Sequence, residues 1–285
     1  MRWVMRLVMC ALTVTLVVSA FAPRALADDL DVLRGAIPVA PATFTRWSGF
    51  YVGGQFAYGN ANADFSSTTQ PLVAFSLREL TLEAEQAPSQ WPVLGKSSNG
   101  ASGYGGFFGY NTQWQDLVLG VEGNYTHTSL ALSATPSPIA RIVPAGGATY
   151  SVTLNGAGAL DVTDYGSLRG RAGLVLGNFL PYGFAGFVMG SGDYSVTTRV
   201  YGQQNSASAI LPCDPGLATC VNYDFSNSAA QNGVLLYGFD AGVGLDWAVT
   251  PNVFVRGELE FLQFAPINNI PVYIVNARAG VGLKF

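Results

Sequence analysis

Eight segments of this chain alternate in side-chain character with a period of two residues, and this pattern constrains the fold more than any other feature. Such alternation is typical of a β-strand whose two faces meet different surroundings. Each segment is roughly 10 residues or slightly longer, which is the length of a strand that crosses a membrane. The segments are residues 49–61, 101–114, 117–129, 164–177, 180–191, 234–249, 252–264 and 272–285.

One face of these predicted strands is apolar and carries no Asp, Glu, Lys or Arg. Phe50 in the first strand and Trp247 in the sixth are typical of this face. In strand 180–191 the phase is least clear, and there we assign Tyr182, Phe184 and Val188 to the apolar face. A face without charge along the length of each strand predicts contact with an apolar surrounding such as lipid.

The opposite face combines glycine with charged side chains of both signs. Its acids and bases are Glu122, Asp240, Asp246, Glu258, Glu260, Arg169, Arg171, Arg256, Arg278 and Lys284. A barrel of eight strands has an interior just wide enough to be filled by side chains. Carboxylates and basic groups paired in such an interior escape the cost of unpaired buried charge. We therefore expect an all-β fold, an eight-stranded antiparallel up-and-down transmembrane β-barrel, with these ten side chains as a charge network in its lumen.

Other classes of protein fit the sequence less well. A soluble β-sandwich would turn the polar face to water, where the two signs of charge need not balance. A bundle of transmembrane helices needs about 20 consecutive apolar residues, and the best candidate, Ala172–Gly190, is interrupted by Pro181 and several glycines. Only 11% of residues are charged, which excludes an intrinsically disordered chain. The net charge of −4 disfavours a nucleic-acid binder.

The connections between the predicted strands alternate in length, as in an up-and-down barrel. Tight turns are expected near residues 115–116, 178–179 and 250–251. Segments of about 35–40 residues join strands 1–2, 3–4 and 5–6, and the loop between strands 7 and 8, around Pro266 to Pro271, is short. Short turns and long loops define the periplasmic and extracellular sides, which places both termini in the periplasm. In the first long loop, Ser76–Glu79 has a capping-box pattern and begins either a helix to Gln86 or a coil.

The N-terminus has the parts of a secretory signal peptide. Arg2 and Arg6 precede an apolar run of about 12 residues, and Ala25–Ala27 supplies a cleavage motif. The run is too short for a membrane-spanning helix. We expect a signal peptide over residues 1–27, a periplasmic extended leader over 28–46, and an outer-membrane β-barrel domain over 47–285.

Cys213 and Cys220 are the only cysteines after the predicted signal peptide, and six residues separate them. In an exported chain such a pair predicts a local disulfide, with two free thiols as the alternative. No histidine lies near them, so we expect no zinc site there. The sequence indicates no other metal site and no cofactor.

Several strand motifs carry a family likeness. Residues 47–54 read WSGFYVGG, 104–111 read YGGFFGYN, 167–173 read SLRGRAG, 179–182 read FLPY and 277–285 read ARAGVGLKF. In this order they resemble small alphaproteobacterial outer-membrane β-barrel proteins of the porin-like surface-antigen type, barrels similar to OmpA and OmpX. The resemblance covers nearly the whole chain after the signal peptide, and the long loops match it poorly.

The resemblance implies a surface protein that supports the envelope and makes contacts through its extracellular loops. Its partners would be outer-membrane lipid, lipopolysaccharide and the outer-membrane assembly machinery. In this family that machinery recognises the last strand, and here the signal residues would be Val281, Leu283 and Phe285. A filled lumen argues against a wide aqueous pore, and a narrow channel is an alternative.

Some members of this family bind hemin or host surfaces, which makes an adhesive or hemin-binding role another alternative. The long loops carry no histidine. Only Tyr150, Tyr194, Tyr201 and Tyr223 could ligate iron there, and tyrosines in loops are usually amphipathic surface residues.

His127 and Ser129 are the candidates for chemistry. At i and i+2 on one strand, they project to the same lipid-facing side near the extracellular rim. The order aromatic-x-His-x-Ser resembles the motif of lipid A deacylases, in which a His–Ser pair hydrolyses an acyl ester. However, Leu130 stands where those enzymes carry a polar residue, and no acidic residue can be assigned to orient His127. We favour an interfacial histidine beside a loop-start serine and expect no enzyme.

Overall fold

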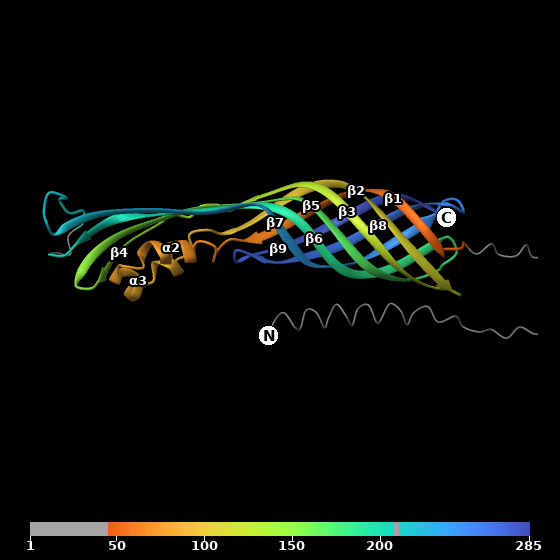
Figure 1. The fold of residues 1–285 in the computed structure, drawn as a ribbon, viewed down its shortest axis with the longest axis horizontal. Helices are drawn as coiled ribbons and strands as arrows, with labels where there is room; N and C mark the ends of the chain where they lie inside the picture. Colours follow the sequence, from red (N-terminus) through yellow and green to blue (C-terminus); the bar gives the residue numbers. More distant parts are fainter. Residues whose placement is uncertain (1–44, 208–210) are drawn as a thin grey trace, which may run out of the picture. The chain divides into compact units, whose positions relative to one another are not determined.

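The computed structural model describes residues 45–207 and 211–285, so the predicted signal peptide and nearly all of the predicted leader lie outside the described residues. The described residues form one unit. Its elements are β1 (Gly49–Asp64), α2 (Gln70–Leu77), α3 (Thr81–Gln86), η2 (Pro88–Gln90), β2 (Lys96–Trp114), β3 (Leu117–Ser133), β4 (Ile139–Ala145), β5 (Ala148–Leu174), β6 (Phe179–Asn205), β7 (Cys220–Ala248), β8 (Val253–Ile267) and β9 (Ile270–Lys284) (Figure 1). Among the described residues, no helix is both long and apolar enough to span a membrane.

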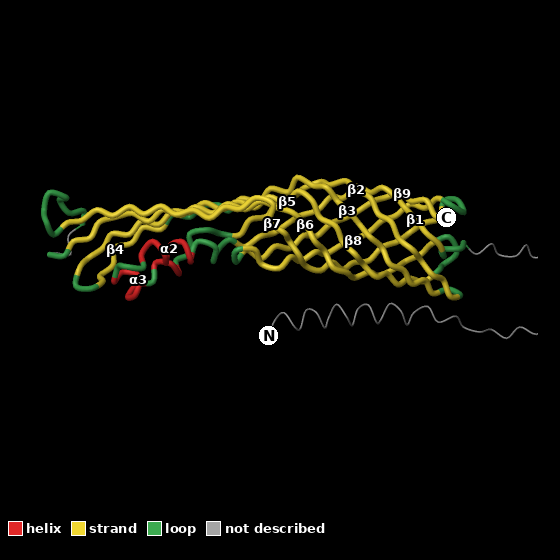
Figure 2. The backbone as a smooth tube through the Cα atoms, viewed as in Figure 1, coloured by secondary structure: helices red, strands yellow, loops and turns green. Residues whose placement is uncertain are grey.

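Eight of the strands close into a barrel (Figure 2). Each pairs antiparallel with its neighbours in the order β1, β2, β3, β5, β6, β7, β8, β9, and β9 pairs with β1 to complete the ring. Closure leaves none of these strands with a free edge along the barrel wall, which a strand exposed to lipid could not tolerate. The predicted eight-stranded antiparallel barrel is confirmed.

Tight turns join the strands at one end of the barrel, which we call the turn end. The connections at the opposite end, the loop end, are longer except for the one between β8 and β9. There Asn268 and Asn269 both have positive φ, 45° and 65°, in a two-residue turn between paired Ile267 and Ile270. Positive φ at both central positions is typical of the type I′ hairpin turn that asparagine favours.

Three strands are much longer than predicted. β5 and β6 have 27 residues each and β7 has 29, and they continue beyond the barrel at the loop end (Figure 1). With β4 they form a four-stranded antiparallel sheet, built from β4, residues 148–160, residues 194–205 and residues 220–231. We call it the loop-end sheet. These segments are strands and not the predicted loops, and the buried Tyr150, Val152 and Leu154 continue the period-two alternation through one of them.

The helices of the first connection cover one face of the loop-end sheet. Val73 and Leu77 of α2 and Leu82 of α3 are buried against Val152 and Val200 of the sheet. These residues belong to an apolar core that is separate from the barrel interior. The loop end of this protein therefore carries a folded structure of its own.

The predicted helix from Ser76 to Gln86 is wrong in its bounds. α2 begins earlier, with a proline in its first turn, and ends at Leu77, and α3 begins only at Thr81. The Ser76 hydroxyl donates to the Leu72 carbonyl inside α2, at 2.8 Å, so it does not cap a helix start. A proline is favoured in a first helical turn because its missing N–H is not needed there.

The apolar outer face is confirmed for seven of the eight predicted strands and wrong for 180–191. Tyr182, Phe184 and Val188 point into the lumen and are buried. The outward side chains of β6 are instead those of the opposite phase, among them Phe187, which is 78% exposed, and Met189. The error arose because aromatic side chains were assigned to lipid, whereas in this strand two aromatic rings serve the interior.

Candidate functional site

Side chains in three successive layers fill the lumen from the turn end to the loop end. Along β8, the inward side chains in this direction are Phe254, Arg256, Glu258, Glu260, Leu262 and Phe264. The layer at the turn end is mostly aromatic and aliphatic, the middle layer is charged, and the layer at the loop end is apolar. The barrel therefore holds a polar interior between two apolar closures.

The middle layer, here named the charge layer, is a single network of ion pairs. Its members are Glu122, Asp246, Glu258, Glu260, Arg169, Arg171, Arg256 and Arg278. All eight side chains are almost completely buried. The structure thus brings together eight of the ten residues that the sequence analysis assigned to the lumen.

Glu122 and Asp246 illustrate how the charge layer is satisfied. Glu122 accepts hydrogen bonds from Arg169 Nε at 2.9 Å and from Arg256 Nη1 at 2.7 Å. Asp246 accepts from Arg256 Nε at 2.8 Å and from Arg171 Nη2 at 2.7 Å. Hydrogen bonds between ionised partners are the strong ones, and removal of one partner would leave an uncompensated buried charge.

Aromatic rings from the inner wall support the arginines. The guanidinium groups of Arg169 and Arg171 lie over the rings of Phe184 and Tyr182, at 4.1 and 3.8 Å from the ring centres. The Tyr182 hydroxyl also donates to Glu258 at 2.5 Å. These contacts explain why Tyr182 and Phe184 point into the lumen and not toward lipid as predicted, because a desolvated cation is stabilised by the face of an aromatic ring.

Asp240 and Lys284 lie in the lumen but outside the charge layer. Neither has an ion-pair partner within 4.0 Å among the described residues. Lys284 Nζ donates to the Arg46 carbonyl at 2.9 Å and lies 4.1 Å from the centre of the Trp47 ring, at the turn end. Both oxygens of Asp240 are buried without a hydrogen-bond partner in the part of the chain that the structure describes. For these two residues the expected pairing in the lumen is wrong.

The apolar layer at the loop end, here named the apolar plug, closes the lumen on that side. It includes inward side chains from the barrel strands, such as Leu132, Leu262 and Phe264. Phe65 and Leu94, from the connection between β1 and β2, are also buried in it. Water would have to cross this packed layer to reach the charges.

His127 has an acidic neighbour that the sequence analysis missed. Its Nδ1 lies 2.8 Å from Asp164 Oδ1, and the Tyr125 hydroxyl donates to the same carboxylate oxygen at 2.5 Å. His127 and Asp164 are direct cross-strand partners of β3 and β5. A long connection that contains β4 joins β3 to β5, so no tight turn sets the register of this pair and no signal in the sequence could have found it.

Ser129 is outward-facing and exposed, as is His127 in part, so the two share a side of the sheet as predicted. A register shift in the pairing of β3 with β5 follows directly after His127. Within the described part of the chain, Ser129 forms no side-chain hydrogen bond with His127. The structure therefore supplies an acidic orienter for the histidine but not a histidine contact for the serine.

The four loop tyrosines do not converge on one point. Tyr150 and Tyr223 pack against each other in the core of the loop-end sheet, Tyr194 contacts the apolar plug, and Tyr201 lies on Arg199. The Tyr223 hydroxyl donates to the Ser151 carbonyl at 2.5 Å. Burial raises the pKa of Tyr223, which disfavours the phenolate form that would ligate ferric iron.

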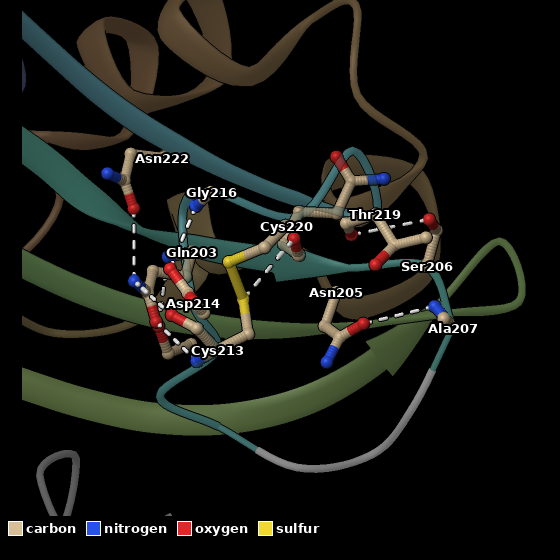
Figure 3. The surroundings of a disulfide bond; sticks show 12 residues. Gln203, Asn205, Ser206, Ala207, Cys213, Asp214, Gly216, Thr219, Cys220 and Asn222 are labelled. Atoms are coloured by element: carbon tan, nitrogen blue, oxygen red, sulfur yellow. Dashed lines mark hydrogen bonds between the residues drawn. A yellow bond between two sulfur atoms is a disulfide. The ribbon is translucent and has the colours of Figure 1, made fainter.

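The disulfide lies at the tip of the loop-end sheet (Figure 3). Cys213 and Cys220 are bonded, with their Cα atoms 5.9 Å apart, and the predicted pairing is present. Gln203 Oε1 accepts from the Cys213 amide at 3.0 Å and so ties the bridged segment to β6. The bridge joins Cys213, in the connection between β6 and β7, to the first residue of β7.

The face of the loop-end sheet opposite the helices is polar. Arg199 and Asp224 form a two-point ion pair there, at 2.9 and 2.6 Å. Beside it is a hollow of about 410 Å³, lined on this face by Asn155, Thr197, Arg199, Ser226 and Ser228 among other residues. Along residues 220–231, β7 pairs with β6 on one side, and no described strand pairs with its other side.

The C-terminal residues complete the barrel wall. Val281, Leu283 and Phe285 all point outward and are exposed. The Phe285 amide donates to the Phe50 carbonyl at 2.9 Å, which joins the end of the chain to β1. Their role as an assembly signal stays a prediction.

Comparison with known families agrees with this architecture. A family model described as "Outer membrane protein beta-barrel domain" matches residues 32–285, a range that includes all of the described residues. No curated protein matches the sequence.

Several solved structures resemble the chain at low identity. Ail, the attachment invasion locus protein of Yersinia pestis in complex with the heparin analogue sucrose octasulfate, is 12% identical, with 83% of this chain and 99% of Ail covered and a TM-score of 0.33. Neisserial surface protein A is 16% identical, with coverages of 84% and 98% and a TM-score of 0.34. The outer membrane protease OmpT from Escherichia coli is 9% identical, with coverages of 83% and 97% and a TM-score of 0.29.

Proposed function

Because the chain belongs to the outer membrane protein beta-barrel family, we propose that it is a non-enzymatic outer-membrane barrel with a closed lumen, which presents a folded sheet for contact at the cell surface. The observation that carries this proposal is the loop-end sheet. Three barrel strands continue into it, and helices cover one of its faces around a separate apolar core. In barrels of this architecture the long connections are extracellular.

The polar face of the loop-end sheet is the part best suited to contact. It offers Ser, Thr and Asn side chains around a hollow, together with the exposed Arg199–Asp224 pair. The open edge of β7 adds backbone donors and acceptors that a partner can use. A surface held by its own core is also already ordered, so a partner binds without the cost of ordering a loop.

Splicing at three cross-strand pairs tests the role of the loop-end sheet. Residues 65–95, 134–158 and 195–230 are each replaced by Asn-Gly, which joins Asp64 to Lys96, Ser133 to Ala159 and Tyr194 to Gln231 across existing pairs. Bacteria that display the spliced barrel should lose adhesion to host cells or matrix, while those with the full chain adhere. Equal adhesion by both would contradict the proposal.

The closed lumen leads us to expect no stable channel. The charge layer lies between a packed aromatic layer and the apolar plug, and an eight-stranded barrel leaves no room for an open passage beside them. Planar-bilayer recordings of the purified protein should show only the bilayer's background conductance. Stable large single-channel steps would contradict the closed lumen and favour a porin.

Ester hydrolysis at His127 is the second candidate function, and Asp164 is the observation that favours it. An acid on His127 Nδ1 leaves the other ring nitrogen free to take a proton from a nucleophile. We nevertheless rank it below a surface role, because Ser129 does not contact the ring. Mass spectrometry of lipid A from cells that express the wild type or Ser129→Ala decides it. Identical acylation excludes the enzyme, and acyl chains lost only with the wild type would establish it.

Hemin binding is disfavoured by the placement of the four tyrosines, because Tyr150 and Tyr223 serve the core of the loop-end sheet. Titration of hemin into the purified protein, followed by visible absorption, should give no saturable change in the Soret band. A saturable change that is lost in Tyr201→Phe, the variant of the tyrosine packed against Arg199, would reverse this conclusion.

A further inference from the structure

The charge layer is balanced without Asp240. It contains the carboxylates Glu122, Asp246, Glu258 and Glu260, and each lies within 4.0 Å of at least one of Arg169, Arg171, Arg256 and Arg278. Lys284, the fifth base of the lumen, is bound at the turn end instead. The inner wall therefore carries five carboxylates, whereas the charge layer supplies four arginines to pair with them.

Asp240 is that additional carboxylate. The residue is 1% exposed, and neither of its oxygens has a hydrogen-bond partner among the described residues. Its cross-strand neighbours are Gly186 of β6 and Leu262 of β8, neither of which has a side-chain donor. The positions two residues before and after it on β7, Gly238 and Gly242, have none either.

The charged groups around Asp240 belong to other pairs. Arg169 of β5 donates to Glu122 and Glu258, and Arg278 of β9 forms an ion pair with Glu260 of β8, although the Arg278 nitrogens form no hydrogen bond among the described residues. The Ser167 hydroxyl of β5 is near enough to act on the carboxylate, but the pair does not have hydrogen-bond geometry, and Ser167 Oγ is likewise buried without a partner. The Asp240 carboxylate and the Ser167 hydroxyl are therefore two neighbouring buried groups without a hydrogen-bond partner among the described residues.

We propose that Asp240 binds one small cation, a proton or an alkali-metal ion, inside the closed lumen, with the Ser167 hydroxyl as a neighbouring oxygen ligand. An ionised carboxylate without a counter-charge is costly to bury. One bound positive charge removes that cost and completes the balance of the lumen. The apolar plug, to which the neighbouring Leu262 belongs, keeps bulk water from solvating the Asp240 carboxylate.

Unfolding of the full protein, purified from outer membranes in detergent, tests the proposal. The variant is Asp240→Asn, which keeps the shape of the side chain and removes its charge. The matched control is Asp246→Asn on the same strand, whose carboxylate has two arginine partners. At pH 7, Asp240→Asn should unfold within a few degrees of the wild type, whereas Asp246→Asn should unfold roughly 10 °C lower. Far-UV circular dichroism follows the transition.

Two arms of the experiment separate a proton from an alkali-metal ion. If Asp240 holds a proton that the unfolded chain has released, raising the pH favours the unfolded state, by up to tenfold in the unfolding constant per pH unit, and Asp240→Asn abolishes this dependence. If Asp240 holds an alkali-metal ion, replacing sodium chloride with choline chloride at constant ionic strength lowers the unfolding temperature of the wild type but not that of Asp240→Asn.

Two results would overturn the proposal. In one, Asp240→Asn is as destabilised as Asp246→Asn under every condition, which would show that the carboxylate is ionised and bound to protein groups. In the other, wild type and Asp240→Asn respond identically to pH and to the cation, which would show that no positive charge depends on Asp240.

Discussion

Single residues on the inner wall show why glycine and arginine occur together there. A Cβ on Gly186 would lie 2.6 Å from the Cβ of Arg169 and 2.3 Å from the Leu168 carbonyl oxygen. Glycine at this position lets the stem of Arg169 lie across the neighbouring strand, so that its guanidinium group reaches Glu122. The glycine content of the chain thus serves the charge layer as well as the turns.

This arrangement predicts that Gly186→Ala destabilises the barrel. The added methyl group displaces Arg169, and we expect a loss of about 1–3 kcal/mol in the free energy of unfolding. Gly170→Ala is the control, because a Cβ there faces outward and meets only one carbonyl oxygen, at 4.0 Å. Urea unfolding in detergent measures both, and equal effects would contradict the role assigned to Gly186.

Burial predicts different costs for two arginine substitutions. Arg256→Gln removes a partner of both Glu122 and Asp246 inside the lumen, so it should cost about 3–5 kcal/mol. Arg199→Gln breaks the exposed pair with Asp224, which water screens, and should change the stability far less than Arg256→Gln does. Unfolding by urea compares them, and a small effect of Arg256→Gln would mean that the charge layer is not a stabilising network.

At the scale of elements, α2 is held by its buried side rather than by its own sequence. It has only eight residues, and a helix this short is not stable alone in water. Val73 and Leu77 face the loop-end sheet, and the Asn227 side chain of β7 donates to Ser76 Oγ at 2.6 Å. The helix and the sheet therefore depend on each other for order.

Leu77→Ala should loosen the loop-end sheet without affecting the barrel. Removal of this fully buried side chain leaves a cavity that costs about 2–5 kcal/mol. Phe75→Ala on the same helix is the control, since Phe75 is 58% exposed. Limited proteolysis of intact cells should cut the Leu77→Ala protein faster between residues 65 and 95. If Phe75→Ala is cut equally fast, the packing described for α2 is wrong.

At the scale of the whole molecule, the barrel and the loop-end sheet have separate cores. The chain spliced at the three cross-strand pairs should therefore still fold into membranes and resist protease there. Its apolar plug lacks Phe65 and Leu94, so it should unfold at lower temperature than the full chain. Its charge layer remains, so it should still not conduct. Failure of the spliced chain to insert would show that the barrel needs the sheet to fold.

Much of the barrel could be predicted from sequence because lipid imposes a local rule. Every outward position of a membrane strand must be apolar, so the period-two pattern identified seven faces and the eight strands themselves. The rule does not apply beyond the membrane, and there β5, β6 and β7 continued undetected through segments treated as loops. The rule also failed in β6, where Tyr182 and Phe184 support arginines from the inside.

The sequence by itself determined the composition of the two faces, and with it the closed barrel, because the alternation of side chains is a property of consecutive residues. Only the tertiary structure decided which charges meet. Asp164 lies beside His127 across a strand pair, Lys284 lies at the turn end, and Asp240 has no hydrogen-bond partner among the described residues. Such contacts join residues that are distant along the chain, and their geometry follows from register and closure, which no local pattern contains.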